Sequence, residues 1–147
     1  MKTVAQLLKL KVKHNQQVHT IAPHQMVLEA LMVMAEKNVG ALPVLENGQV
    51  VGVISERDYA RKLVLHGRSS VGTPVRDIMS APVVTVDSHQ TVDTCMGIMT
   101  DSHLRHLPVV ENGKLLGMIS IGDVVKQRLD DTELEVETLR GYVTGQG

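Results

Sequence analysis

The sequence predicts an α/β (α+β) fold in which two tandem β-α-β-β-α repeats form one pseudo-two-fold module, followed by a C-terminal helix. Three observations support this fold class. Residues 20–58 align with residues 85–123 without a gap, and 15 of these 39 pairs are identical. Each copy carries an Asn-Gly pair between two apolar runs. Ahead of each pair, apolar residues recur at the spacing of a helix with one buried face.

Each repeat is expected to begin with a short β-branched strand and an amphipathic helix. The strand candidates are Val18–Ile21 and Val83–Val86. In the second copy Asp87 stands three residues before Gln90, which indicates a helix N-cap, whereas the first copy has Pro23 at the helix start. The buried helix faces are predicted at Val27, Ala30, Leu31 and Met34, and at Val92, Cys95, Met96 and Met99.

A hairpin and a second helix complete each repeat. Leu42–Leu45 and Gln49–Ile54 flank Asn47-Gly48, and both central residues of a tight primed turn need positive φ. The last helix of each copy is expected to begin at Ser55 and at Ser120. The second copy repeats the hairpin pattern over Leu107–Val110, Asn112-Gly113 and Lys114–Ile119.

The repeats are bounded by short segments of different character. Thr73–Met79 predicts a short lead-in helix capped by Thr73 with Pro74 first, and Thr3–Leu8 is its expected counterpart. A unit of about 60 residues is marginal alone, so the halves are expected to share a core. A solvated loop is expected at Lys9, Lys11, Lys13 and His14. We place repeat one at residues 8–66, a linker at 67–74, repeat two at 75–129 and a helical tail at 130–147.

The tail carries apolar residues at heptad spacing, interrupted by one threonine. Two interpretations of this seam stay open. The helix packs on its own chain, or it meets a second subunit and makes the protein a homodimer. The seam positions are Val125, Leu129, Thr132, Val136, Leu139 and Val143.

The charge, the cysteine content and the aromatic content of the chain exclude several classes of function. The 147-residue chain has a formal net charge of -1, which provides no general field for nucleic acid or an anionic membrane. One cysteine excludes an internal disulfide, and the N-terminal residues lack a secretory apolar segment, so we expect a cytoplasmic protein. Trp and Phe are absent and Tyr occurs twice. Base stacking on aromatic side chains is therefore nearly excluded, and a bound purine would lie between aliphatic side chains and backbone.

The repeated order of strand, helix, Leu-Pro-Val, turn and Gly-x-Ile-Ser-x-x-Asp resembles the cystathionine-β-synthase (CBS) domain, which occurs in pairs. Gly52–Asp58 and Gly117–Asp123 carry the family pattern Gly-x-x-[Ser/Thr]-x-x-Asp, and the resemblance covers residues 18–128. The chain resembles the short, stand-alone bacterial members of this family. The resemblance implies a two-repeat disc with two clefts that bind adenosine compounds such as AMP, ADP, ATP, S-adenosylmethionine or NAD(H).

Ser55, Arg57 and Asp58 lie where a strand is predicted to turn into a helix. The first N–H groups of a helix suit a phosphate, and Arg57 can add a bidentate contact. Ser55 can hydrogen-bond phosphate or ribose, and a carboxylate can accept both hydroxyl protons of a ribose. The resemblance assigns that role to Asp58 and Asp123. Alternatively, Ser55/Asp58 and Ser120/Asp123 are helix-capping boxes, and the two roles are compatible.

The resemblance also implies which segments face each carboxylate. Asp58 would face Val84-Thr85 and Leu104-Arg105-His106, whereas Asp123 would face Thr20-Ile21 and Val39-Gly40-Ala41. The second set offers no charge, and repeat two has Ile121-Gly122 where repeat one has Glu56-Arg57. We therefore expect the Asp58 cleft to take the phosphate-bearing ligand more tightly. The candidate ligand-binding residues are Ser55, Arg57, Asp58, Val84, Thr85, Leu104, Arg105, His106, Thr20, Ile21, Gly40, Ala41, Ser120 and Asp123.

Three functions remain open at this point. The favoured one is a regulatory nucleotide sensor whose ligand (AMP, ATP or NADH) shifts its conformation or its dimer, with output through an effector protein. The second is a ligand-free structural dimer that docks on a partner. An enzyme is disfavoured because no base–nucleophile pair is recognisable. No metal site is expected, since His103 and His106 have no neighbouring cysteine and Asp101 is the nearest carboxylate.

Overall fold

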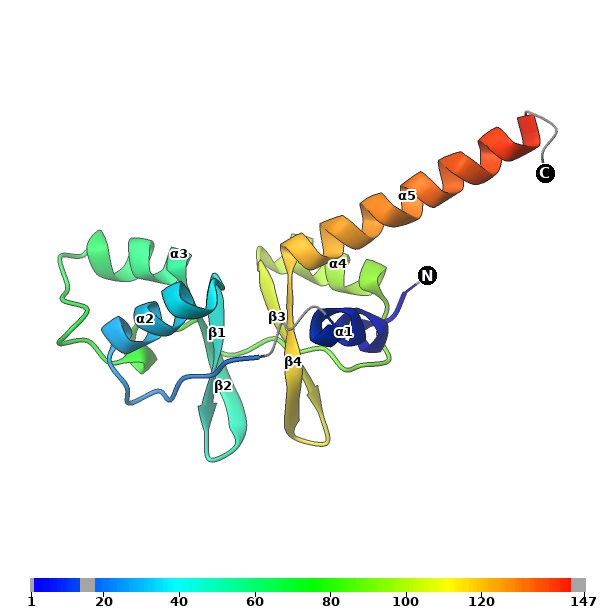
Figure 1. Ribbon diagram of the computed structural model, residues 1–147. Coiled ribbons are helices and arrows are strands. Elements are labelled where there is room, and N and C mark those ends of the chain that lie inside the picture. The colour runs from blue at the N-terminus through cyan, green and yellow to red at the C-terminus, as the bar shows by residue number, and fades with distance from the viewer. Residues whose placement is uncertain (1, 14–17, 144–147) are drawn as a thin grey trace.

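The computed structural model describes residues 2–13 and 18–143 and confirms a mixed α+β fold with two repeats and a C-terminal helix. Two hairpins stand side by side at the centre, with helices on their outer sides (Figure 1). The elements in chain order are α1 (Val4–Lys13), α2 (Val27–Lys37), β1 (Ala41–Glu46), β2 (Gln49–Ser55), α3 (Glu56–Asp58), the π-helix η1 (Tyr59–Val64), the 3-10 helix η2 (Val75–Asp77), α4 (Val92–Ser102), β3 (His106–Glu111), β4 (Lys114–Ser120) and α5 (Ile121–Val143).

Both predicted hairpins are confirmed. β1 pairs antiparallel with β2, and β3 pairs antiparallel with β4, with the register shifting at the corresponding position in each repeat. Asn47 and Gly48 have φ of 52° and 79°, and Asn112 and Gly113 have φ of 50° and 77°. These values belong to a primed turn, which explains why the same Asn-Gly pair ends the first strand of both hairpins.

The predicted first strands are reduced to single bridging residues. Ile21 bridges Val44 in parallel, and Val86 bridges Val109 in the same way. The chain leaves the sheet directly afterwards, where Asp87 Oδ1 accepts hydrogen bonds from the amides of His89 and Gln90. An aspartate that bonds its own following backbone favours a turn over a continued strand.

The same turn moves the start of the helix that follows it. α4 begins at Val92, and its N-cap is Thr91, whose side chain accepts a hydrogen bond from the Thr94 amide, so the prediction of Asp87 as N-cap was wrong. In repeat one α2 begins at Val27 rather than at Pro23. The predicted buried faces hold at Val27, Ala30 and Met34, and at Val92, Cys95 and Met99. Burial also raises the pKa of the Cys95 thiol, which fits an inert core residue.

The lead-in segments exchange between the repeats. α1 precedes repeat one in sequence, yet Val4 and Leu7 are buried in the core of repeat two. η2 precedes repeat two, yet Val75 and Ile78 are buried in the core of repeat one. Backbone hydrogen bonds of 2.8 Å fix each exchange, from the Val4 amide to Gln90 O and from the Val75 amide to Gln25 O. The two repeats are therefore held together by more than the contact between their hairpins.

The predictions for the lead-in segments are corrected in two respects. Thr73 does not cap a helix, because η2 follows Pro74 with no side-chain cap. Lys9 and Lys11, expected in a loop, are part of α1, which ends at Lys13. At its start, the Thr3 amide donates to Gln6 Oε1 and the Gln6 amide donates to Thr3 Oγ1. A Gln three residues after a Thr cap stabilises the helix start, which the lysine run then follows. His14 lies outside the described residues.

α5 projects from the body, so the interpretation that its seam packs on its own chain was wrong (Figure 1). Val125, Leu129, Val136 and Leu139 on the seam are exposed. The helix is long, but no helix among the described residues has a stretch apolar enough to cross a membrane.

Candidate functional site: two clefts between the repeats

The Asp58 cleft is a cavity of about 500 Å³ between the repeats, within the usual size range of small-molecule sites. Repeat one supplies the end of β2 with α3 and η1, repeat two supplies the loop before β3, and the connection between the repeats closes the third side. Its lining residues are Gly40, Val53, Ser55, Glu56, Arg57, Asp58, Arg61, Lys62, Ser80, Pro82, Val83, Val84, His103, Leu104, Arg105 and His106.

Asp58 forms the capping box that the sequence analysis weighed against a ligand role. Its Oδ2 accepts hydrogen bonds from the Ser55 amide at 2.9 Å and the Ser55 hydroxyl at 3.0 Å, and the Asp58 amide donates to Ser55 Oγ at 3.2 Å. The residue is only 7% exposed, although it lines the cleft. The capping contacts use one carboxylate oxygen and hold it in place.

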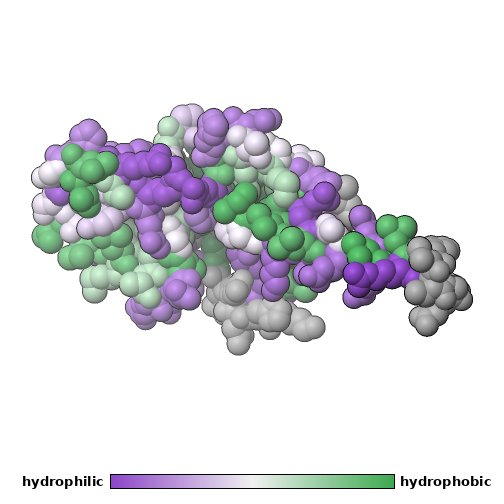
Figure 2. Space-filling model, turned by 90° about the horizontal axis from the view of Figure 1, so that it is seen from above, coloured by the Kyte–Doolittle hydropathy of each residue, from purple (hydrophilic) through white to green (hydrophobic). Residues whose placement is uncertain are grey.

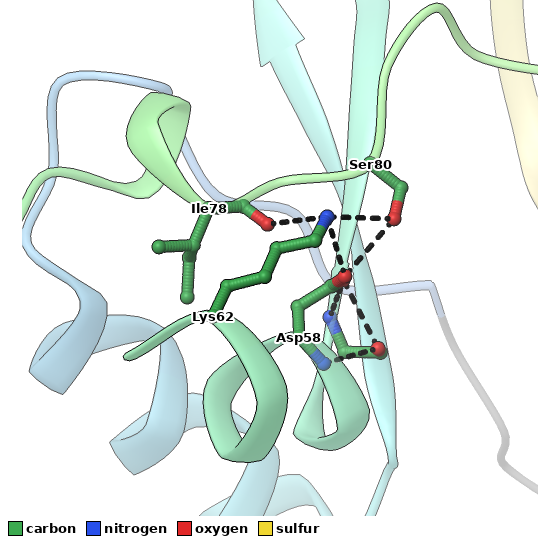
Figure 3. A network of polar contacts seen from close by, with 5 residues as sticks. Asp58, Lys62, Ile78 and Ser80 are labelled. Carbon is green, nitrogen blue, oxygen red and sulfur yellow. Dashed lines mark hydrogen bonds and ion pairs between the residues drawn. The ribbon is translucent and has the colours of Figure 1, made fainter. Parts of the chain in front are cut away.

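The other oxygen of Asp58 is directed to Lys62 and Ser80 (Figure 3). Lys62 Nζ lies 3.0 Å from Asp58 Oδ1, and the Ser80 hydroxyl donates to the same oxygen at 3.0 Å. Lys62 also donates to the carbonyl of Ile78 at 3.1 Å. The Lys62 side chain is 45% exposed, so this half of the network can exchange its partners with a ligand or with water.

Ser80 is positioned by the strand beside it. Its amide donates to Val53 O at 2.8 Å, and its carbonyl accepts from the Val53 amide at 3.2 Å. The close approach depends on Gly52, where an added Cβ would lie 2.7 Å from Met79 Sδ and 3.0 Å from Ser80 O. Gly52, the first residue of the repeated motif, therefore allows the connection between the repeats to reach Asp58.

The Asp58 cleft is strongly cationic. Arg57, Arg61 and Lys62 come from repeat one, and Arg105 comes from repeat two. The guanidinium groups of Arg105 and Arg61 lower the pKa of Arg57 from its ordinary value, burial adds to this effect, and the nearby Asp58 opposes it. Like charges that perturb one another in this way favour binding of an anion that would neutralise them.

The Asp123 cleft is larger, at about 910 Å³, and it contains a cation that the sequence analysis did not expect. Lys11 Nζ lies 2.9 Å from Asp123 Oδ2 and donates to the Met118 carbonyl at 2.7 Å. Asp123 Oδ2 also accepts from the Ser120 amide at 2.8 Å, and Ser120 Oγ accepts from the Asp123 amide. The expectation that this cleft faces no charge was therefore wrong, because α1 crosses to repeat two and brings Lys11 with it.

His106 and Gly40 line both clefts. Burial lowers the pKa of His106 from its ordinary value, Lys11 and Arg105 lower it further, and Asp123 and Asp58 act in the opposite direction. His106 is thus a lining residue of both cavities and lies within electrostatic reach of both carboxylates.

Eleven of the fourteen predicted site residues line a cleft, and three do not. Thr85 lies outside the Asp58 cleft, and Ile21 is instead a core residue that bridges β1. Thr20 is exposed, and the neighbouring Val18 and His19 line the Asp123 cleft in its place. The polar side chains that line the clefts and were not predicted from the sequence include Arg61, Lys62, Ser80, Lys11, His19 and Lys37. Helical spacing from Asp58 could have indicated Arg61 and Lys62, whereas nothing local distinguishes Ser80 or Lys11.

A metal centre is not evident in the parts of the chain that the structure describes. No group of three or more His, Cys, Asp or Glu side chains there could hold a metal ion. The clefts are instead lined by cations, by aliphatic side chains and by carboxylates at a helix start, which are Glu56 and Asp58 in one cleft and Asp123 in the other.

The model for the CBS domain matches this chain twice, over residues 9–65 and 75–130. The chain belongs to the CBS domain family. It is 40% identical to the mitochondrial CBS domain-containing protein CBSX3 of Arabidopsis thaliana in an alignment of 124 residues that covers 81% of this chain but 60% of that protein. It is 32% identical to the CBS domain-containing protein YhcV of Bacillus subtilis, with 78% of this chain and 81% of that protein covered.

Solved structures of CBS-domain proteins share the fold. One from Burkholderia ambifaria is 47% identical and superposes with a TM-score of 0.83, covering 88% of this chain and 96% of that one. CBSX2, solved in complex with AMP, is 25% identical with a TM-score of 0.70, covering 88% of this chain and 98% of that one. The resemblance and the fold class predicted from the sequence are both confirmed.

Proposed function

We propose that this protein is a regulatory module, not an enzyme, that binds an adenine nucleotide in the Asp58 cleft and responds with a change of conformation or of subunit contact. The observation that carries the proposal is the pairing in one cavity of a carboxylate at a helix start with cationic side chains from both repeats. A ligand with a hydroxylated sugar and a phosphate matches both features. The AMP complex of the related CBSX2 supports the choice of an adenosine compound.

The ribose is assigned to Asp58. Its Oδ2 is held by Ser55, so a sugar hydroxyl would bind at Oδ1, where Lys62 and Ser80 donate in the absence of ligand. Replacing one donor by another keeps the buried carboxylate satisfied throughout the exchange. The displaced Lys62 ammonium would then lie near Arg57, beside the phosphate. AMP, ATP and NADH all carry the required groups.

The base is assigned to the aliphatic side of the cleft. Val84 and Leu104 line the cavity on the side of the connection and of repeat two, and Val53 lines it from repeat one. No Tyr is among the described residues that line the cleft, so a purine there would be held mainly by aliphatic side chains and backbone. A ligand placed in this way contacts both repeats, which is what a change of conformation requires.

The Asp123 cleft is proposed to bind nucleotide more weakly. Lys11 neutralises Asp123 from within the chain, in an ion pair whose side chains are 23% and 21% exposed, and this reduces the attraction of the carboxylate for a further donor. His19 and Lys37 still make this cleft attractive to phosphate. The two clefts therefore differ for a structural reason, a lysine from α1, and not because one of them lacks charge.

Calorimetric titration with adenosine, AMP, ATP and NADH tests the proposal. We expect one tight site per chain, with affinity rising from adenosine to the phosphorylated ligands and falling with added salt. The absence of heat and of any thermal stabilisation with all four ligands would contradict it.

A ligand-free structural dimer is the second candidate, because the protein's own side chains already satisfy Asp58 and Asp123. In that case the ion pairs are permanent, and substitution of Asp58 affects stability alone. Under either proposal the protein is a homodimer that acts through an effector protein in the cytoplasm and binds neither nucleic acid nor membrane.

A further inference from the structure

The projecting part of α5 carries an apolar seam that the described part of the chain leaves uncovered. Val125, Leu129, Val136 and Leu139 are 44%, 60%, 41% and 64% exposed. They fall, with Thr132, at alternating intervals of four and three residues, and Val143 is next in register. Hydrophobic residues are visible on the projecting arm beside hydrophilic ones (Figure 2).

The opposite face of α5 is the one that contacts the body. Val124 is fully buried, and Gln127 is 4% exposed and donates to Asp131 one turn later. Arg128 at the edge of the seam fastens the helix to α4 through Asp93 at 3.2 Å. Because the body lies behind the helix, a second helix can lie along the seam without meeting it.

We propose that α5 pairs with α5 of a second copy of this chain as a parallel, in-register, two-stranded coiled coil. The seams of two copies of α5 have the same length and spacing, so they can pack against each other along their whole length. Apolar residues at alternating intervals of four and three are the pattern that a coiled coil requires. Val136 and Leu139 occupy the a and d positions of one heptad, a combination that favours two parallel strands. The two bodies then lie on opposite outer sides of the pair.

The charges beside the seam select the parallel orientation. In a parallel pair, Glu135 faces the partner's Arg140, and Arg128, which also pairs with Asp93 of its own chain, faces the partner's Glu133. In an antiparallel pair with full overlap, Glu135 would face the partner's Glu135, and Glu133 would face the partner's Glu133. Flanking charges of this kind add little energy but choose between orientations.

Disulfide trapping tests this pairing without any nucleotide, so its outcome is separate from that of the proposed sensor function. Single cysteines are placed at Val125 and Leu139 on the seam, in a Cys95→Ala background that copies Ala30 at the equivalent position of repeat one. The control is Leu134→Cys on the outer face, because Leu134 and Leu139 are both 64% exposed on the same helix. Only close Cα pairs can be bridged.

We expect Val125→Cys and Leu139→Cys each to form disulfide-linked dimers under mild oxidation, at least tenfold faster than Leu134→Cys. Equal rates for Leu134→Cys and Leu139→Cys, no dimer at either seam position, or trapping at only one of them would each overturn the parallel in-register pair. All three side chains are exposed, so the three cysteine substitutions remove no core contact, and the buried Cys95→Ala change is common to the seam variants and the control.

A charge exchange tests the orientation independently. Glu135→Arg should slow trapping of Leu139→Cys about tenfold, because it places two arginines opposite each other on both sides of the pair. Adding Arg140→Glu should restore the original rate. Failure of the second substitution to restore the rate would show that Glu135 and Arg140 do not face each other across the seam.

Discussion

Lys11 Nζ lies 2.9 Å from Asp123 Oδ2, and this contact joins a helix at the start of the chain to the second copy of the family motif. The corresponding carboxylate of repeat one, Asp58, is contacted by Lys62 of its own repeat. The two motif carboxylates are therefore neutralised by lysines of different origin. Lys62 follows Asp58 by four residues, whereas Lys11 is more than a hundred residues from Asp123 in the sequence.

Removing Lys11 should open the second site. In Lys11→Met we expect a second nucleotide to bind per chain, because Asp123 then loses its neutralising cation and keeps the bond from the Ser120 amide. Loss of the half-buried ion pair should cost about 1 kcal/mol of unfolding free energy. Calorimetric stoichiometry with AMP measures the effect, and Lys9→Met, an exposed position on the same helix, is the control. An unchanged stoichiometry would mean that Lys11 does not limit the second cleft.

Replacing Lys62 should separate ribose binding from phosphate binding. In Lys62→Met the Oδ1 of Asp58 loses a competing donor, so adenosine should bind several-fold more tightly, whereas ATP should gain less because a cation is lost. Arg61→Met is the control, because it also removes a cation that lines the cleft. Asp58 Oδ1 is contacted by Lys62 and Ser80, so this control leaves those contacts in place. It should weaken ATP binding with no gain for adenosine. Parallel changes for both ligands in Lys62→Met would refute the proposed exchange.

His106 should make stability depend on pH. Burial lowers its pKa in the folded protein, and Lys11 adds to the effect, so below the ordinary histidine value of about 6.5 the unfolded chain binds more protons. Stability is therefore full above that value and falls as the pH decreases. We expect the melting temperature of His106→Gln to change less between about pH 5 and 8, where histidine titrates, than that of the wild-type protein. Thermal melts over this range measure the effect. The exposed His24→Gln is the control, and an unaltered slope in His106→Gln would exclude this residue as the cause.

The motif glycines should differ in their tolerance of a methyl group. An added Cβ at Gly52 meets the backbone carbonyl of Ser80 at 3.0 Å as well as Met79, whereas at Gly117 its three nearest atoms all belong to the flexible side chain of Leu8. Gly52→Ala should therefore cost about 1–3 kcal/mol and weaken AMP binding by displacing Ser80, and Gly117→Ala should cost less. Denaturant unfolding and calorimetry compare them. Equal losses in both variants would argue against the positioning role of Gly52.

The fold was largely predictable because the duplication supplies each local signal twice. Asn47-Gly48 and Asn112-Gly113 specify the hairpins through positive φ, and their agreement in the structure follows from local chemistry. The exchange of α1 and η2 between the repeats depends on tertiary packing of Val4 and Val75, which no local pattern encodes. That exchange is why a lysine assigned to a solvated loop reaches Asp123.

The candidate site was predictable to the same extent. Asp58, Arg57 and Arg105 follow from the repeated motif and from the resemblance, and the structure brings them to one cavity. Ser80 was missed because its position depends on pairing with Val53 across the connection between the repeats. The strand expected at Val83–Val86 shortened to one residue, so Thr85 lies outside the cleft.

The most direct test compares Asp58→Ala with Asp123→Ala by calorimetric titration with AMP. Both substitutions remove a capping carboxylate at a helix start, so each should cost about 1 kcal/mol of stability. We expect Asp58→Ala to weaken AMP binding about ten- to a hundredfold and Asp123→Ala to leave the tight site unchanged. AMP binding that is equal in Asp58→Ala and the wild-type protein would contradict the assignment of the nucleotide to the Asp58 cleft.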